Sequence, residues 1–201
     1  MQIASFSTRS ANVTAADRPA LTPGNIIDAA LRCFARDGVA STSLQDIATE
    51  LGVTKAAIYH HYATKREIIE LALAPAFDTI EQILDITRLH DDPRKQVEGL
   101  IVGLADQAIR HRDRYRVLLA DLAALKALGP GSRYRTLFDE LVRRLGAAST
   151  EPGYSLRVNT FLLGLMSPAI DVQASDIDDD VLRRTIANIG RDLLLPEPAT
   201  P

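Results

Sequence analysis

The chain has 201 residues, 46% of them hydrophobic, and is long enough to bury the core of one large domain or two small ones. Its formal net charge of -3 argues against a protein that coats nucleic acid without sequence preference, because such binding grows with positive charge. Charged residues, Gly or Pro interrupt every apolar run well before the ~20 residues that a membrane span requires. The single cysteine, Cys33, cannot form an internal disulfide, so we expect a cytoplasmic protein in which Cys33 is a small core residue.

Residue patterns divide the chain into four segments. Residues 1–21 are rich in Ser, Thr, Ala and Asn and contain no apolar run, which favours a flexible arm over a secretory signal. From there on, apolar residues recur at helical spacing, and no run has the period of two that is typical of β-strands. We therefore predict an all-α fold with a head over residues 22–66, a body over residues 67–195 and a tail over residues 196–201.

The first helix is predicted to begin at Pro23, because Thr22 can cap it and proline fits the first helical position. Gly38 marks its end. Ser43 then precedes the next helix, with Asp46 at the spacing of a capping box. The residues of the first helix expected to face the core are Ile27, Ala30, Leu31 and Phe34.

A helix-turn-helix is predicted between residues 44 and 62. Gly52 ends its first helix, because glycine takes the left-handed cap conformation at little cost. Thr54 can cap the second helix, which we expect over residues 55–62. The first helix has apolar residues at positions i, i+3, i+4 and i+7, namely Leu44, Ile47, Ala48 and Leu51.

The second of these helices is predicted to expose one face to a partner. Ala48, Gly52 and Ile58 provide the small residue, the bend and the apolar plug that a helix-turn-helix needs. When Ile58 and Tyr62 face inward, the opposite face is left for contact with a major groove, which admits one helix. That face carries Ala56, Tyr59, His60 and Ala63.

Three stretches around this motif, Thr22 to Gly38, Ser41 to Ala48 and Tyr59 to Lys65, closely resemble the TetR family of bacterial transcriptional regulators. The resemblance covers residues 22–69, and no comparable motif follows it. It implies a three-helix DNA-binding head, a helical body that binds a small-molecule effector, and repression relieved by that effector.

Candidate DNA contacts come from two sources. The resemblance implies contacts by Thr54 and Lys55 at the start of the second helix, by Tyr59 and His60 in or beside the groove, and by Lys65 to phosphate. The residues themselves add methyl contact from Ala56 and donors to phosphate beside the first helix, although hydroxyls there can also serve only as caps. These additional donors are Thr42, Ser43 and Gln45.

The body is predicted to consist of further helices. Thr64 caps a helix that Pro75 interrupts, either as a hinge between head and body or as an ordinary kink. Asp92 and Pro93 open a helix with a wide apolar face. The basic run at residues 111–116 is interpreted as a solvated charge run at a helix junction. Ser132 caps a later helix that ends at Gly146.

The last two helices are predicted to form a homodimer. The helix over residues 154–170 has little polar surface and must be buried on most sides, so its free side is expected to meet a second copy. The aspartates before the final helix, Asp176 and residues 178–180, are interpreted as a dipole and solubility feature rather than a metal site.

An enzyme is not expected, because none of the four histidines has the spacing of a catalytic or metal site and no glycine-rich phosphate loop occurs. No cofactor is expected. The alternative to an operator-binding regulator is a helical scaffold without operator preference. A mostly apolar effector is expected, with an acidic end met by Arg110 or Arg114. The residues expected to line its pocket are Phe77, Leu104, Tyr115, Leu118, Leu122, Phe138, Phe161 and Met166.

Overall fold

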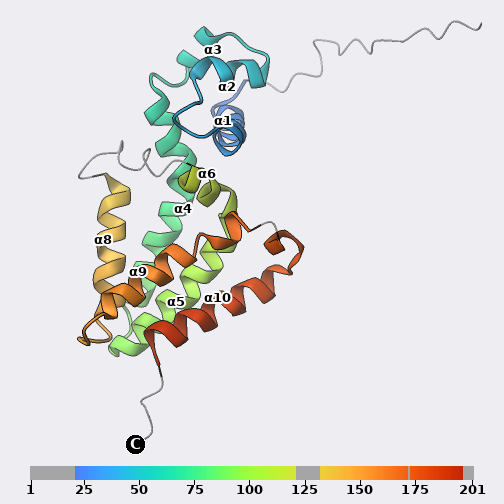
Figure 1. The fold of residues 1–201 in the computed structure, drawn as a ribbon. Coiled ribbons are helices and arrows are strands. Elements are labelled where there is room, and N and C mark those ends of the chain that lie inside the picture. The colour runs from blue at the N-terminus through green and yellow to red at the C-terminus, as the bar shows by residue number, and fades with distance from the viewer. Residues whose placement is uncertain (1–20, 121–131, 172, 197–201) are drawn as a thin grey trace, which may run out of the picture.

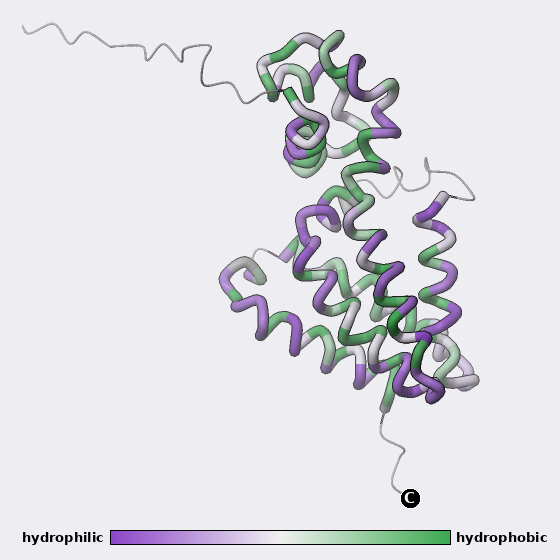
Figure 2. The backbone as a smooth tube through the Cα atoms, turned by 180° about the vertical axis from the view of Figure 1, so that it is seen from behind, coloured by the Kyte–Doolittle hydropathy of each residue, from purple (hydrophilic) through white to green (hydrophobic). Residues whose placement is uncertain are grey.

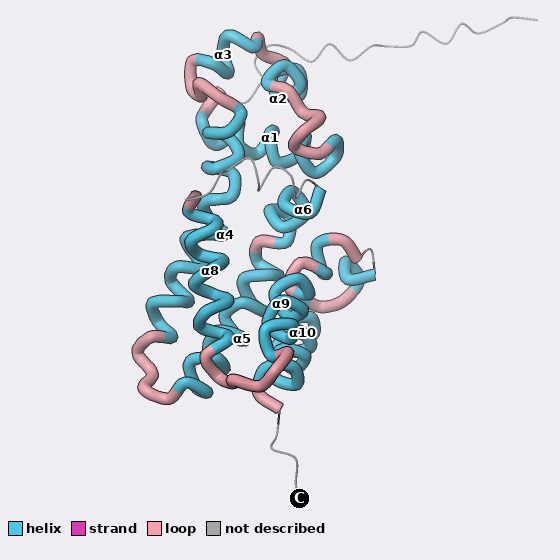
Figure 3. Tube along the Cα trace, turned by 60° about the vertical axis from the view of Figure 1, so that its left-hand side comes forward, coloured by secondary structure: helices cyan, strands magenta, loops and turns pink. Residues whose placement is uncertain are grey.

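The computed structural model describes residues 21–120, 132–171 and 173–196. Within these ranges the chain consists of helices and loops without a β-strand, so the predicted all-α fold is confirmed (Figure 3). No helix in the described ranges is both long and apolar enough to cross a membrane. The α-helices are α1 Pro23–Asp37, α2 Leu44–Leu51, α3 Lys55–Tyr59, α4 Lys65–Thr87, α5 Pro93–Arg110, α6 Arg112–Ala120, α8 Arg133–Gly146, α9 Tyr154–Gly164 and α10 Asp179–Leu194.

Helices α1, α2 and α3 form a head at one end of the molecule (Figure 1). The predicted caps are present: the Thr22 hydroxyl accepts from the backbone N–H of Asn25, and Ser43 and Asp46 form a complete capping box. Gly52 ends α2 in the left-handed conformation with φ 66°. These caps satisfy backbone N–H groups that the first turn leaves free, so they fix where each short helix begins.

Helix α4 joins the head to the body (Figure 1). Its cap is Thr64, as expected, but the helix continues through Pro75 instead of stopping there. A proline inside a helix removes one backbone hydrogen bond, and side chains from other helices bond to neighbouring carbonyls. Arg114 Nε donates to the carbonyl oxygen of Ala72 at 3.0 Å, and Gln107 Nε2 donates to that of Ala76 at 3.3 Å.

The body packs α4, α5, α8, α9 and α10 around one apolar core. Hydrophilic and hydrophobic residues alternate along these helices (Figure 2), as expected when each helix turns one face to the core. Helix α10 lies close against α5 because Gly190 has no side chain there. A Cβ at Gly190 would be 2.6 Å from a side-chain carbon of Ile101.

Helix α6 lies between the head and the body and contacts α1 (Figure 1). The interpretation of residues 111–116 as a solvated charge run is therefore only partly right, because Asp113 and Arg116 are exposed but other residues of the run are not. His111 and Tyr115 are buried, and Arg116 Nε donates to the carbonyl oxygen of Ala169 at 3.0 Å. Arg114 and Arg116 both donate to backbone carbonyls of other elements, and the pattern of charges along the sequence does not distinguish this role from solvation.

Three further expectations differ from the structure in detail. Helix α3 ends at Tyr59, three residues before the predicted end at Tyr62, because the chain turns there to bury Tyr62. Helix α9 ends at Gly164, and a short 3-10 turn at Ser167–Ala169 follows. In α1, Ile27 and Leu31 are only half-buried, because the fully buried stripe is shifted by one position and consists of Ile26, Ala29, Ala30, Cys33 and Phe34.

Candidate functional site

The helix-turn-helix is held rigidly against α1 by ion pairs that cross between helices. Arg32 Nε and Arg36 Nη1 lie 3.0 and 3.3 Å from the two carboxylate oxygens of Glu50 on α2. Arg32 and then Arg36 lower the pKa of the Glu50 carboxyl below its usual value. The Tyr62 hydroxyl donates to the carbonyl oxygen of Pro23 at 3.0 Å, which ties the end of the motif to the start of α1. The first link joins α2 to α1, and the second joins the residues after α3 to α1.

Helix α3 presents the exposed face that the sequence predicted. Ile58 is fully buried, whereas Tyr59 is 50% exposed and Ala56 and His60 are exposed. The Lys55 ammonium lies 5.6 Å from the centre of the Tyr59 ring, so the two side chains share one surface. Thr54 is exposed, and its hydroxyl accepts from the backbone N–H of Ala57 at 3.3 Å.

The polar side chains predicted to contact DNA beside α2 differ in whether they can still bond to a partner. Gln45 is exposed, whereas both hydrogen-bonding roles of the Ser43 hydroxyl are used in the capping box with Asp46. Thr42 is only 2% exposed and donates its hydroxyl proton to the carbonyl oxygen of Gly38. The expectation that Thr42 offers a donor to phosphate is wrong, because a buried hydroxyl that already donates cannot reach a duplex.

Lys65 also has a different environment from the one expected. Its ammonium donates to the carbonyl oxygens of Val39, Ala40 and Thr42 at 2.8, 3.4 and 2.9 Å. An ammonium has three N–H donors, and these three carbonyls occupy all of them. Lys65 therefore joins α4 to the loop between α1 and α2, and the structure does not support its assignment to phosphate.

The basic residues of the head are mostly engaged within the protein. Arg32 and Arg36 pair with acidic residues, Arg66 Nε lies 2.8 Å from a carboxylate oxygen of Glu70, and Lys65 is held by carbonyls. The Lys55 ammonium instead lies beside an exposed aromatic ring. The positive charge available at this surface is therefore concentrated at Lys55.

A second candidate site is a small apolar cavity in the body, of about 70 Å³. Ring contacts line one wall, where Tyr134 lies 5.9 Å from Phe77 and 6.2 Å from Phe138 between ring centres. The described residues that line it carry no charge: Phe77, Ile80, Leu104, Tyr115, Tyr134, Leu137, Phe138, Leu141, Leu162, Leu165 and Met166. Such a lining suits an apolar ligand.

The structure brings together five of the predicted pocket residues, namely Phe77, Leu104, Tyr115, Phe138 and Met166. Phe161 is buried elsewhere, with its ring beside Gly190 of α10. The Leu118 side chain and Leu122 lie outside the part of the chain that the structure describes. Sequence reasoning missed Tyr134 as a lining residue, although its place in the apolar stripe of α8 gave a signal.

The structure does not support the prediction that Arg110 or Arg114 meets an acidic end of a ligand in this cavity. Arg110 pairs with Asp106 at 2.6 Å, and Arg114 donates to a carbonyl of α4. Neither side chain lines the cavity. Two hydroxyls belong to the lining, those of Tyr115 and Tyr134, and the Tyr115 hydroxyl donates to Oε1 of the fully buried Gln107. Tyr115 is the more deeply buried of the two tyrosines. Burial raises the pKa of Tyr115 far above its usual value, so this group stays neutral.

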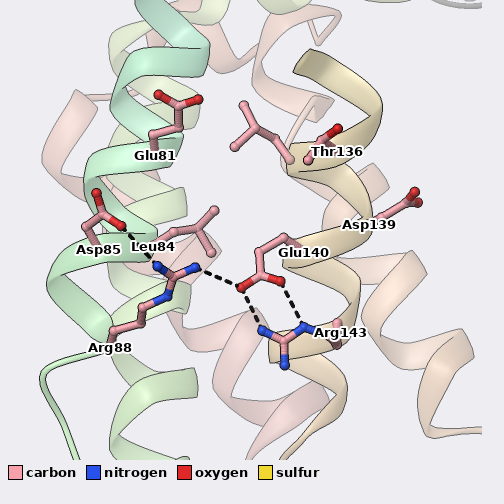
Figure 4. A pocket seen from close by; sticks show the side chains of 9 residues that line it. Glu81, Leu84, Asp85, Arg88, Thr136, Asp139, Glu140 and Arg143 are labelled. Atoms are coloured by element: carbon pink, nitrogen blue, oxygen red, sulfur yellow. Dashed lines mark hydrogen bonds and ion pairs between the residues drawn. The ribbon is translucent and has the colours of Figure 1, made fainter. Parts of the chain in front are cut away.

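A larger groove of about 610 Å³ lies on the surface between α4 and α8, and its lining is charged. Figure 4 shows Arg88 placed between Asp85 and Glu140, with Arg143 on the other side of Glu140. Arg88 Nη2 is 3.3 Å and Arg143 Nη2 is 2.7 Å from Oε1 of Glu140. These groups already neutralise one another, so the groove is a weaker candidate than the apolar cavity. No cluster of three potential metal ligands occurs among the described residues.

The head and its exposed α3 define a helix-turn-helix protein with a helical body. Residues 26–72 match the sequence model of the family described as "Bacterial regulatory proteins, tetR family". Together with the relatives below, this match assigns residues 26–72 to the DNA-binding region of the TetR family of bacterial regulators.

Two relatives illustrate the similarity. The HTH-type transcriptional repressor KstR2 of Mycobacterium tuberculosis is 29% identical over 112 residues, 55% of this chain and 56% of KstR2. The icaADBC negative regulator IcaR of Staphylococcus epidermidis is 31% identical over 125 residues, 59% of this chain and 66% of IcaR. The chain thus spans between about half and two thirds of these relatives.

The similarity of solved structures concerns the fold. The KstR2 structure superimposes with a TM-score of 0.65 at 17% identity, covering 83% of this chain and 92% of KstR2. AibR, solved with isovaleryl coenzyme A and operator DNA, gives a TM-score of 0.62 at 17% identity, covering 86% of this chain and 96% of AibR.

Proposed function

We propose that the chain is a sequence-specific DNA-binding transcriptional regulator that represses from a palindromic operator and is released by a small-molecule effector. The observation that carries this proposal is the exposed face of α3, on which Lys55, Tyr59 and His60 project from a helix-turn-helix. The names of KstR2 and IcaR, a repressor and a negative regulator, support repression. We further propose that the protein acts in the cytoplasm and catalyses no reaction.

Each side chain has a proposed role at the duplex. Tyr59 and His60 contact base edges or the groove wall, and Lys55 neutralises a phosphate. Ala56 offers its methyl group to thymine, and Gln45 donates from the start of α2. Thr54 and Ser43 retain their capping roles and approach the backbone as secondary contacts. In this proposal Lys65 supports the head and does not contact DNA.

A homodimer through α9 and α10 would present two heads to adjacent half-sites, which lie about 34 Å apart on one face of the duplex. Apolar side chains on both helices support this proposal. Leu156 and Leu163 on α9 are 69% and 63% exposed, and Ile189 on α10 is 51% exposed. Exposed apolar residues gathered on two packed helices are typical of a surface that a second protein covers.

We propose residues 22–66 as the DNA-binding head and residues 67–195 as the effector-binding and dimerisation body. Helix α4 belongs to both, because it starts in the head and contributes Phe77 and Ile80 to the cavity. An effector that favours a body conformation with a different separation of the two heads would weaken DNA binding, and by linkage DNA would weaken effector binding equally.

Selection of bound fragments from a random DNA pool tests this function. The proposal predicts an inverted repeat whose half-sites are one helical turn apart. The double variant Tyr59→Ala/His60→Ala is the matched control, since both side chains are exposed and neither belongs to the core. It should lose or change the recovered motif. A wild-type protein that enriches no sequence would favour the alternative of a helical scaffold.

A further inference from the structure

Two buried polar side chains connect the apolar cavity to the backbone of α4 beside Pro75. Tyr115, on the cavity wall, donates its hydroxyl proton to Oε1 of Gln107. Gln107 is fully buried in α5 and donates from Nε2 to the carbonyl oxygen of Ala76 at 3.3 Å. The carbonyl that accepts this bond belongs to the residue directly after the proline that interrupts the hydrogen-bond pattern of α4.

The described lining of the cavity carries two hydroxyls, those of Tyr115 and Tyr134, and no charge. Tyr115 is 8% exposed, and its hydroxyl oxygen keeps lone pairs that can accept while its proton can be donated to only one partner at a time. A carboxylate placed among the apolar side chains around it would be desolvated without a cation to pair with, which is strongly unfavourable. Arg114 and Arg116, the cations next to Tyr115 in the chain, donate to the carbonyl oxygens of Ala72 and Ala169.

We propose that the cavity binds a small uncharged molecule with an apolar body and a single carbonyl or hydroxyl oxygen, which is recognised by Tyr115 and sensed at α4 through Gln107. This inference deepens the proposed regulatory function and rests on it for its consequence. It assigns the site to neutral ligands and excludes free acids and acyl thioesters of coenzyme A, including the class of ligand seen with AibR.

The coupling follows from competition for one proton. A ligand carbonyl that accepts the Tyr115 proton takes it from Gln107, whose Oε1 is then left without a donor in a dry site. Rotation of the Gln107 amide to recover a partner gives up the bond to the Ala76 carbonyl. That change occurs one residue after Pro75, whose missing N–H removes one backbone bond from the same helix.

The small free volume of the cavity also favours coupling between ligand binding and the position of α4. It is far below the ~300–1,000 Å³ of sites for drug-sized ligands, so a ligand must push the walls apart. One wall is α4 itself, through Phe77 and Ile80, and another includes Met166, whose unbranched side chain adapts readily. Binding therefore displaces the helix that leads to the head.

Three probes of matched shape test the ligand class: acetophenone, ethylbenzene and benzoate. Their dissociation constants are measured by isothermal titration calorimetry on the full chain and on Tyr115→Phe, which keeps the ring and removes the hydroxyl. Acetophenone should bind the Tyr115→Phe variant 3- to 10-fold more weakly than the wild type, which is about the effect of one net hydrogen bond. Ethylbenzene should bind both proteins equally, and benzoate should bind neither. Benzoate binding comparable to that of acetophenone, or acetophenone binding unchanged in Tyr115→Phe, would overturn the inference.

The location of binding is tested by filling the cavity. Leu104→Phe should abolish binding of both neutral probes, and Met166→Phe, at a half-buried and more tolerant position, provides the same test where the first variant does not fold. Binding that survives in folded, filled variants would contradict the assigned site.

The coupling is tested with Gln107→Leu on the DNA recovered by selection. This variant should bind ethylbenzene as the wild type does, and acetophenone should change its DNA affinity no more than ethylbenzene does, because only the displacement of the cavity walls remains. An unchanged response to acetophenone would overturn the role of Gln107. Because calorimetry needs no DNA, a protein that binds acetophenone as expected but no operator contradicts only the regulatory function, whereas operator binding without probe binding contradicts only this inference.

Discussion

Replacement of Lys65 by Met distinguishes a structural role from a DNA contact. Methionine keeps an unbranched apolar stem and removes the ammonium that bonds to the carbonyls of Val39, Ala40 and Thr42. Two of these bonds, at 2.8 and 2.9 Å, are short and charge-assisted. Their loss leaves partly buried carbonyls without that partner, at a cost of about 1.5–3 kcal/mol.

For a cooperative unit of this size, that cost lowers the Tm by about 3–12 °C, since ~1 kcal/mol corresponds to roughly 2–4 °C. Differential scanning calorimetry measures the shift. Fluorescence anisotropy then measures DNA affinity against salt concentration at a temperature where the variant is folded, and the slope should equal that of the wild type.

Lys55→Met is the matched control, because Lys55 is exposed and its ammonium lies beside the Tyr59 ring. It should leave the Tm nearly unchanged and reduce the salt slope by about one for each protomer. The structural role of Lys65 is refuted if the Tm of Lys65→Met equals that of the wild type and its salt slope is reduced as much as that of Lys55→Met.

Three more predictions concern stability. Burial, followed by Arg114 and Arg110, lowers the pKa of His111, so the unfolded chain binds more protons than the folded chain once the pH falls below about 6.5. The free energy of unfolding should therefore fall below that pH in the wild type, and should fall less in His111→Gln. Urea titrations at several pH values would measure this difference. Gly190→Ala should lower the free energy of unfolding by about 1–3 kcal/mol, because its Cβ would meet Ile101 and Phe161. Gly146→Ala, which has open space around it, should not lower that free energy. Equal effects of the two substitutions in thermal unfolding would contradict the close packing of α10 on α5. Tyr62→Phe should cost about 1 kcal/mol by removing the bond to the Pro23 carbonyl, and an unchanged midpoint in urea would exclude that contribution.

Local signals predicted the head well. Thr22, Ser43, Thr54 and Thr64 all cap the helices that were expected after them, because caps depend on residues within one turn. Helical spacing from the buried Ile58 likewise predicted the exposed face of α3. The early end of α3 could not be predicted in this way, because it depends on the burial of Tyr62 against α1.

Long-range pairing explains what the sequence could not predict. Lys65, Arg114 and Arg116 carry charges that suggest solvent or phosphate, yet each donates to backbone carbonyls more than 20 residues away. Thr42 looked available beside a helix start and instead turns inward to Gly38. Periodicity placed the cavity residues on the inner faces of their helices, but it did not show which inner faces contact one another. Phe161 was therefore predicted to line the cavity, whereas its ring lies against α10.

The central claim, that the exposed face of α3 meets DNA, is tested most directly by hydrogen exchange with and without the duplex recovered by selection. Mass spectrometry of the full chain should show slower exchange in peptides that cover residues 43–61, with the Tyr59→Ala/His60→Ala variant showing no change under the same conditions. Slower exchange confined to the body, with residues 43–61 unaffected, would contradict the account.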